Sequence, residues 1–124
     1  RSILLFSNEM SAKIYASSDI FLMPSKTEPC GLSQLISMRY GTVPVVHRVG
    51  GLRDTVIPFT GVEGNGFTFE SFQSGDMMDA IYRAVTCFYQ SPDEWNQIIQ
   101  NNLKKDVSWE KSAKQYLSLY HEVL

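Results

Sequence analysis

Short apolar runs alternate with amphipathic stretches in the first half of this chain, and this alternation limits its possible folds more than any other feature. Residues 10–17 and 32–40 place apolar side chains at the three- and four-residue spacing of a helix. A strand–helix–strand order needs crossover connections, which make neighbouring strands parallel. The sequence therefore predicts an α/β, Rossmann-like fold whose parallel sheet has about four strands, with helices on both faces. The strands are expected at residues 3–6, 20–23, 43–46 and 67–69.

From residue 74 onward the pattern is helical, so the C-terminus of the fold is predicted to be helical. The clearest start signal is a capping box, with Ser91 as the N-cap, Pro92 at the first helical position and Glu94 at the third. The last helix is expected to begin near Ser108. Its apolar stripe is predicted to pack in a core, and consists of Trp109, Ala113, Tyr116, Leu117 and Tyr120.

Composition narrows the class of protein. A chain of 124 residues has room for one domain with one core. Its net charge of −2 argues against a general nucleic-acid surface, and no apolar stretch is long enough to span a bilayer. The first residues do not resemble a secretory signal. Two isolated cysteines, Cys30 and a core-forming Cys87, indicate reduced thiols in a cytoplasmic protein, with no metal site and no resident cofactor.

In a parallel sheet, ligands bind beyond the carboxyl ends of the strands, which directs attention to residues 24–35. Gly31 lets the backbone approach a ligand at the start of a helix, where free N–H groups suit a phosphate oxygen. Lys26 and Glu28 lie at the same mouth, and a carboxylate accepts hydrogen bonds from sugar hydroxyls. The segment therefore fits a ligand with phosphate and hydroxyl groups. The alternative is an ordinary loop with a helix-start glycine and a solvated glutamate.

Five blocks of the sequence resemble motifs of one enzyme family. Residues 24–35, PSKTEPCGLSQL, are similar to the signature PS-x-x-EPCGL-[ST]-QL of bacterial and plant-type glycogen and starch synthases. The blocks at 39–46 (RYGTVPVV), 48–56, 66–69 (GFTF) and 108–113 (SWEKSA) resemble the motifs that follow it in that family. The blocks run nearly end to end and in the same order, so the whole chain resembles the C-terminal part of such a synthase.

This resemblance implies a retaining glycosyltransferase with two Rossmann-like domains facing across a cleft, the GT-B fold. Members transfer glucose from ADP-glucose or UDP-glucose to the non-reducing end of an α-1,4-glucan. Residues 1–124 would then form the C-terminal domain that binds the nucleotide sugar, truncated on its N-terminal side. The acceptor domain, and the arginine and lysine that neutralise the leaving diphosphate, would lie upstream. The chain alone is therefore expected to be inactive, and its exposed sheet edge predicts self-association.

The resemblance also implies roles for individual residues. Glu28 falls on the catalytic glutamate, which holds the donor glucose and stabilises the charge that develops at the anomeric centre. The amides at the start of the following helix fall on positions that meet the donor phosphates. The cysteine before them adds local shape or a main-chain contact. The donor-binding set is therefore Lys26, Cys30, Gly31, Leu32 and Ser33.

At a few other positions the resemblance leaves the role of the residue open or assigns none. Phe6 falls where the family often has an aromatic residue beside the nucleotide base, and otherwise caps the core. Gly50 and Gly51 either approach the donor or allow a turn. His47 stands where the family often has arginine, and no role is assigned to it. Ile36 replaces the second glutamate of the E-x7-E pattern of related transferases, which sets a ribose contact aside, as in glycogen synthases generally.

Two other functions compete with this one. The first is a nucleotide-binding or protein-interaction module that keeps the fold and performs no chemistry. Glu28 discriminates between them, because a pure binding module does not need a carboxylate at the sugar end of its site. The second, a sucrose- or trehalose-type transferase, fits less well, because the EPCGL and SWEKSA motifs are typical of the synthases.

Overall fold

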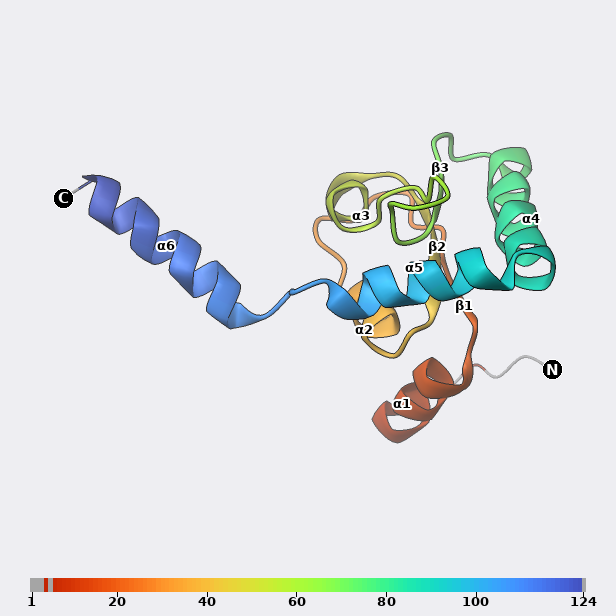
Figure 1. Ribbon diagram of the computed structural model, residues 1–124, viewed down its shortest axis with the longest axis horizontal. Helices are drawn as coiled ribbons and strands as arrows, with labels where there is room; N and C mark the ends of the chain where they lie inside the picture. Colours follow the sequence, from red (N-terminus) through yellow and green to blue (C-terminus); the bar gives the residue numbers. More distant parts are fainter. Residues whose placement is uncertain (1–3, 5, 124) are drawn as a thin grey trace.

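The computed structural model describes residue 4 and residues 6–123. Within them a parallel sheet has the order β1-β2-β3, which confirms the predicted fold class (Figure 1). The expected strand at 3–6 falls partly outside the described residues, and Leu4 and Phe6 belong to no strand. The described sheet thus has three strands where about four were expected. The strands are β1 (Ile20–Met23), β2 (Val43–His47) and β3 (Phe67–Phe69).

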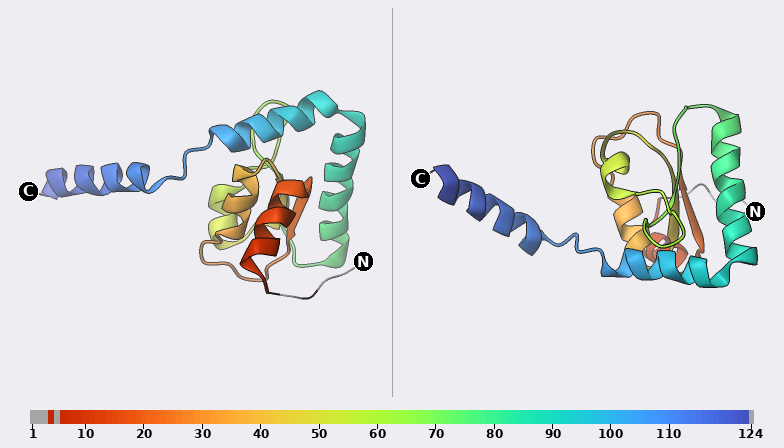
Figure 2. Two further views of the ribbon diagram at one scale, coloured as in Figure 1. Left: turned by 90° about the horizontal axis from the view of Figure 1, so that it is seen from below. Right: turned by 45° about the horizontal axis from the view of Figure 1, so that its top comes forward.

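Helices cover both faces of this sheet, as predicted (Figure 2). One face carries α1 (Asn8–Ser17), α2 (Ser33–Arg39) and α3 (Gly50–Thr55). The other face carries α4 (Ser74–Gln90), and α5 (Pro92–Lys104) crosses the end of the sheet where the strands begin. The opposite end, where the strands finish, is left to loops. The site predicted by the sequence therefore lies at the end of the sheet that none of the described helices crosses.

The central strand β2 is fully buried even though it contains Pro44, which has no N–H to donate. The N–H of Val43 donates to Asp19 O beside β1, so the next residue faces β3. Pairing with β3 begins one position later, where Val45 lies opposite Phe67. The missing donor of Pro44 therefore falls just before the β2–β3 ladder, and β2 remains regular.

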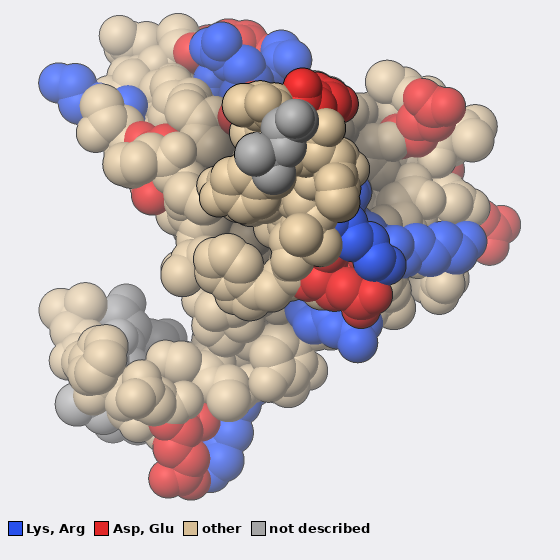
Figure 3. Space-filling view, turned by 90° about the vertical axis from the view of Figure 1, so that its left-hand side faces the viewer, with Lys and Arg blue, Asp and Glu red and all other residues tan. Residues whose placement is uncertain are grey.

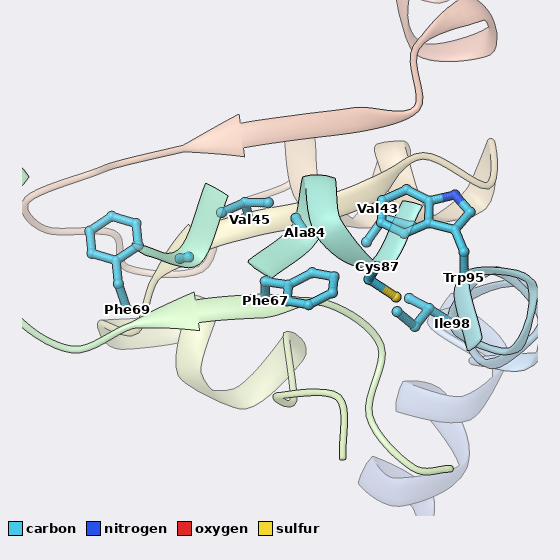
Figure 4. Packing of buried hydrophobic residues seen from close by; sticks show 9 residues of the cluster. Val43, Val45, Phe67, Phe69, Ala84, Cys87, Trp95 and Ile98 are labelled. Atoms are coloured by element: carbon cyan, nitrogen blue, oxygen red, sulfur yellow. The ribbon is translucent and has the colours of Figure 1, made fainter. Parts of the chain in front are cut away.

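Alternating side chains of β2 supply two separate cores. Val45 points to the α4 face and Val46 to the α3 face. The smaller core, on the α3 face, contains Val46, Leu52, Val56 and the half-buried Met23. Figure 4 shows the larger core between the sheet and helices α4 and α5. It consists of Val43, Val45, Phe67, Phe69, Ala80, Ala84, Cys87, Trp95 and Ile98.

Helices α4 and α5 meet at the predicted position, but the predicted capping hydrogen bond is absent there. Helix α5 does begin at Pro92, yet the Ser91 side chain makes no cap hydrogen bond. Ser91 is also the C-cap of α4, where its N–H donates to Cys87 O over 2.9 Å, and its own carbonyl accepts from Trp95 N. Cys87 is buried, as predicted, and burial together with the Glu94 carboxylate raises the pKa of its thiol.

Helix α6 (Trp109–Val123) extends away from the rest of the chain (Figures 1 and 2). No residue of α6 is buried, and Trp109 is 86% exposed. Figure 3 looks at the molecule from the α6 side, and charged side chains lie mainly on one flank of the helix. The predicted helix is confirmed, but the prediction that its apolar stripe packs in a core is wrong. The linker after α5 carries the stripe beyond the reach of either core.

A pair of leucine substitutions tests these cores. Leu52→Ala removes a fully buried side chain from the α3-side core and is expected to lower the free energy of unfolding by about 2–5 kcal/mol. Leu119→Ala makes the same change on exposed α6, where 52% of the leucine is accessible, and is expected to stay within about 0.5 kcal/mol of the wild type. Urea denaturation followed by circular dichroism measures both. Equal losses for the two variants would contradict this assignment of the core.

Candidate functional site

The loop after β1 meets the start of α3 at the carboxyl end of the sheet, and the two segments enclose an open hollow of about 400 Å³. This hollow brings together Lys26 and Glu28, which the sequence placed at one mouth, and adds Gly50. Its complete lining is Lys26, Thr27, Glu28, Pro29, Val49 and Gly50. We refer below to residues 24–32 as the Glu28 loop.

Glu28 is half-buried in this hollow. Ser25 Oγ donates a long hydrogen bond of 3.4 Å to Glu28 Oε2. Among the residues that the structure describes, no lysine or arginine forms an ion pair with this carboxylate. The Glu28 side chain therefore retains acceptor capacity for the hydroxyl groups of a ligand.

The backbone next to Glu28 offers donors as well. Within the described part of the chain, the N–H groups of Gly31, Leu32 and Ser33 donate to no protein acceptor. Gly31 has a φ of +76°, and helix α2 starts only at Ser33, with Leu32 as its N-cap. The sequence had placed that start one residue earlier. Three successive amides beside an acidic side chain suit an anion that also carries hydroxyls.

Gly50 and Gly51 pack directly against the Glu28 loop. A Cβ atom on Gly50 would overlap Glu28 O, and one on Gly51 would overlap the backbone of Cys30. Gly51 N also donates to Glu28 O over 3.1 Å. The glycine pair is thus needed for the close approach of two backbone segments, which accounts for it without any contact to a donor.

A second element that holds the loop is Gln34, which is fully buried at the start of α2. Its Nε2 lies 2.8 Å from Gly31 O, 3.1 Å from Cys30 O and 3.2 Å from Thr55 Oγ1, and its two N–H groups are shared among these three acceptors. From the sequence, no role was assigned to this side chain. The available signal was an amide side chain in a helical turn directly after a glycine.

Two other predicted donor-binding residues lie on the surface. Cys30 is exposed beside the glycine pair, and Phe6 is 91% exposed just before Ser7, the N-cap of α1. In the left view of Figure 2, α1 starts at the edge of the sheet where β1 ends. Phe6 therefore does not cap the core, and its interpretation as a core residue is wrong. Stacking on a nucleotide base stays a prediction for this ring.

The other charged groups and potential metal ligands in the described part of the chain form no second site. Among the described residues, no group of three or more His, Cys, Asp or Glu side chains is placed to hold a metal ion. Burial and then the charge of Lys111 lower the pKa of Lys105, and hydrogen bonds from Ser108 lower the pKa of Asp106. Both groups lie in the linker between α5 and α6. Of the helices described, none is both long and apolar enough to cross a membrane.

Substituting two glycines tests the contact between α3 and the Glu28 loop. Gly51→Ala is expected to lower the free energy of unfolding by about 1–3 kcal/mol, because the new methyl group must displace the backbone of Cys30. Gly75→Ala, on α4, meets nothing within 4 Å and is expected to leave stability unchanged or raise it by up to about 1 kcal/mol. Urea denaturation compares the two, and a destabilisation by Gly75→Ala as large as that by Gly51→Ala would refute the packing argument.

Comparisons with known proteins show which proteins the chain is similar to. The chain is 56% identical over 117 residues to a glycogen synthase of Bacillus licheniformis, with 93% of this chain and 24% of the relative covered. It is 49% identical to a glycogen synthase of Clostridium novyi, covering 98% of this chain and 26% of the relative. The chain therefore spans about a quarter of the length of these curated relatives.

Solved structures give the same picture. The catalytic domain of starch synthase IV from Arabidopsis thaliana, bound to ADP and acarbose, matches with a TM-score of 0.87 and 36% identity, over 97% of this chain and 25% of that one. Sucrose-phosphate synthase from Thermosynechococcus elongatus matches less closely, with a TM-score of 0.72 and 26% identity, over 98% of this chain and 29% of that one. Residues 2–114 match the family described as Glycosyl transferases group 1, and the chain belongs to that family.

Proposed function

We propose that this chain is the donor-binding, C-terminal part of a glycogen-synthase-type enzyme. The complete enzyme would transfer glucose from ADP-glucose or UDP-glucose to the non-reducing end of an α-1,4-glucan, with retention of configuration. The observation that carries the proposal is that Glu28 lines an open hollow and is followed along the chain by the amides of residues 31–33, which donate to no acceptor among the described residues. The identities of 49% and 56% to glycogen synthases support this choice of reaction.

The groups in and after the Glu28 loop match the parts of a nucleotide sugar. The amides of residues 31–33 would hydrogen-bond the diphosphate, and Lys26 would supply a cation at the same mouth. Glu28 would accept hydrogen bonds from the hexose hydroxyls and stabilise positive charge as the bond to the diphosphate breaks. Phe6, exposed at the same end of the sheet, would stack on the base.

The same proposal explains why the chain alone is expected to transfer no glucose. The hollow is open, and the chain spans about a quarter of its relatives' length. A leaving diphosphate needs cations and a closed, dry cleft, which we assign to the remainder of the enzyme. We also propose that the enzyme uses no metal or resident cofactor, since the donor site relies only on amides, a carboxylate and an amine. The two free cysteines support a cytoplasmic location.

Calorimetry on the complete enzyme tests the role of Glu28. The wild type is expected to bind ADP-glucose more tightly than ADP by roughly ten- to a hundredfold, because the carboxylate adds charge-assisted hydrogen bonds to the sugar. Glu28→Ala should remove this difference, leave ADP affinity unchanged and reduce glucose transfer by about a hundredfold or more. Glu63→Ala, at an exposed glutamate outside the hollow, is the matched control and should leave both the binding affinities and the rate of glucose transfer unchanged.

Equal affinity of the wild type for ADP-glucose and ADP, unchanged by Glu28→Ala, would support the alternative function. The chain would then be a nucleotide-binding or protein-interaction module that keeps the fold without the chemistry. Robust glucan elongation by the 124-residue chain itself would also refute the proposal that the reaction needs the rest of the enzyme.

We further propose that the isolated chain self-associates. Strand β1 pairs with β2 on one side only, among the residues described, and helix α6 exposes Trp109 and Tyr116. An open strand edge and an uncovered apolar helix face both favour pairing with another copy. Sedimentation velocity should therefore show a mass that rises with concentration. A single monomeric species at high concentration would contradict this prediction.

A further inference from the structure

His47 ends the central strand β2 and is only 4% exposed, although sequence reasoning assigned it no role. Its Nδ1 lies 2.8 Å from Ser25 O, and its Nε2 lies 3.2 Å from Glu70 O. The ring is stacked on Phe69, with centroids 5.2 Å apart, and tilted against Phe72 at 5.5 Å. One buried side chain therefore connects the loop after β1 with the segment after β3.

The two ends of this connection differ in how firmly they are held. Arg48 N donates to Phe69 O over 2.9 Å, and the Arg48 guanidinium pairs with the Glu70 carboxylate at 3.0 Å. The segment after β3 is thus fixed to β2 independently of His47. Ser25 is different, because none of the other loop anchors, at Gly51 and Gln34, reaches the beginning of the Glu28 loop.

The position of Ser25 matters for the carboxylate that follows it. Ser25 Oγ donates to Glu28 Oε2, and this is the one side-chain hydrogen bond to Glu28 within the described residues. A carbonyl oxygen only accepts, so each of the two contacts of His47 requires an N–H on the ring nitrogen concerned. A neutral imidazole ring has one N–H and can donate to one of the two carbonyls, whereas a ring with two N–H groups can donate to both.

From this geometry we infer that His47 is a positioning residue for Glu28. By hydrogen-bonding Ser25 O and stacking between the two phenylalanines, it holds the first half of the Glu28 loop against the fixed end of the sheet. Glu28 itself touches the donor sugar under the proposed function, on which this inference rests. His47 acts through Ser25 and does not contact the hollow.

Three substitutions separate hydrogen bonding from packing. His47→Phe keeps an aromatic ring for the stack with Phe69 and removes both N–H groups. His47→Arg keeps a planar group that stacks on aromatic rings and donates to more than one carbonyl. His121→Phe makes the first change at the exposed histidine of α6 and serves as the control.

Hydrogen exchange on the 124-residue chain tests the structural part of the inference. In His47→Phe the amide of Gly51, which donates to Glu28 O in the loop, should exchange at least about tenfold faster, whereas amides of α4 and α5 should keep their wild-type rates. His47→Arg and His121→Phe should leave all of these rates unchanged. A uniform acceleration over the whole chain, or none, would overturn the inference. If His47→Phe does not fold, His47→Gln, a polar residue with a single amide group, is judged by the same comparison.

Kinetics on the complete enzyme test the functional part. We expect His47→Phe to lower kcat about ten- to a hundredfold with the Kd for ADP within about twofold, because the loop moves the carboxylate and not the phosphate amides. His47→Arg should restore kcat to within about threefold of the wild type. A kcat unchanged by His47→Phe would overturn the inference. If the wild-type enzyme transfers no glucose, the proposed function fails, and the exchange experiment still decides whether His47 holds the loop.

Discussion

The close contact between the Gly50–Gly51 pair and the Glu28 loop is the constraint on which the rest of the site depends. Two backbone segments approach each other there without any side chain between them, and the Gly51 amide donates to Glu28 O. Because this contact fixes the backbone at Glu28, the carboxylate is held beside the free amides that follow it. The contact also requires α3 to begin immediately after β2, which the short link through Val49 provides.

The layered fold explains why the site forms where it does. Helices α2 and α3 pack on one face of the sheet and α4 on the other, while α5 crosses the end where the strands begin. The carboxyl ends of the strands are therefore the one edge at which loops from both layers meet. Two buried polar side chains, Gln34 and His47, lie at this edge in place of apolar ones. Their side-chain nitrogens hold the loop by contacts with its backbone carbonyl oxygens.

Much of this arrangement could be predicted from the sequence, because local signals and fold agree. The three described strands, the helix after Gly31 and the shared mouth of Lys26 and Glu28 follow from apolar runs, glycine and loop placement. The role of His47 could not be predicted, since its ring contacts carbonyls that lie 22 and 23 residues away in the sequence. For Gln34 the sequence offered only a local signal, because its contact with Thr55 Oγ1 spans 21 residues. The uncovered stripe of α6 was mispredicted, because helical periodicity shows an apolar face but not what covers it.

The most direct test of this account is an experimental structure of the complete enzyme with its nucleotide sugar bound. The account predicts that the diphosphate oxygens lie within hydrogen-bonding distance of the amides of residues 31–33, and that the Glu28 carboxylate contacts hydroxyl groups of the hexose. A donor bound elsewhere, with the Glu28 side chain turned into solvent, would contradict it.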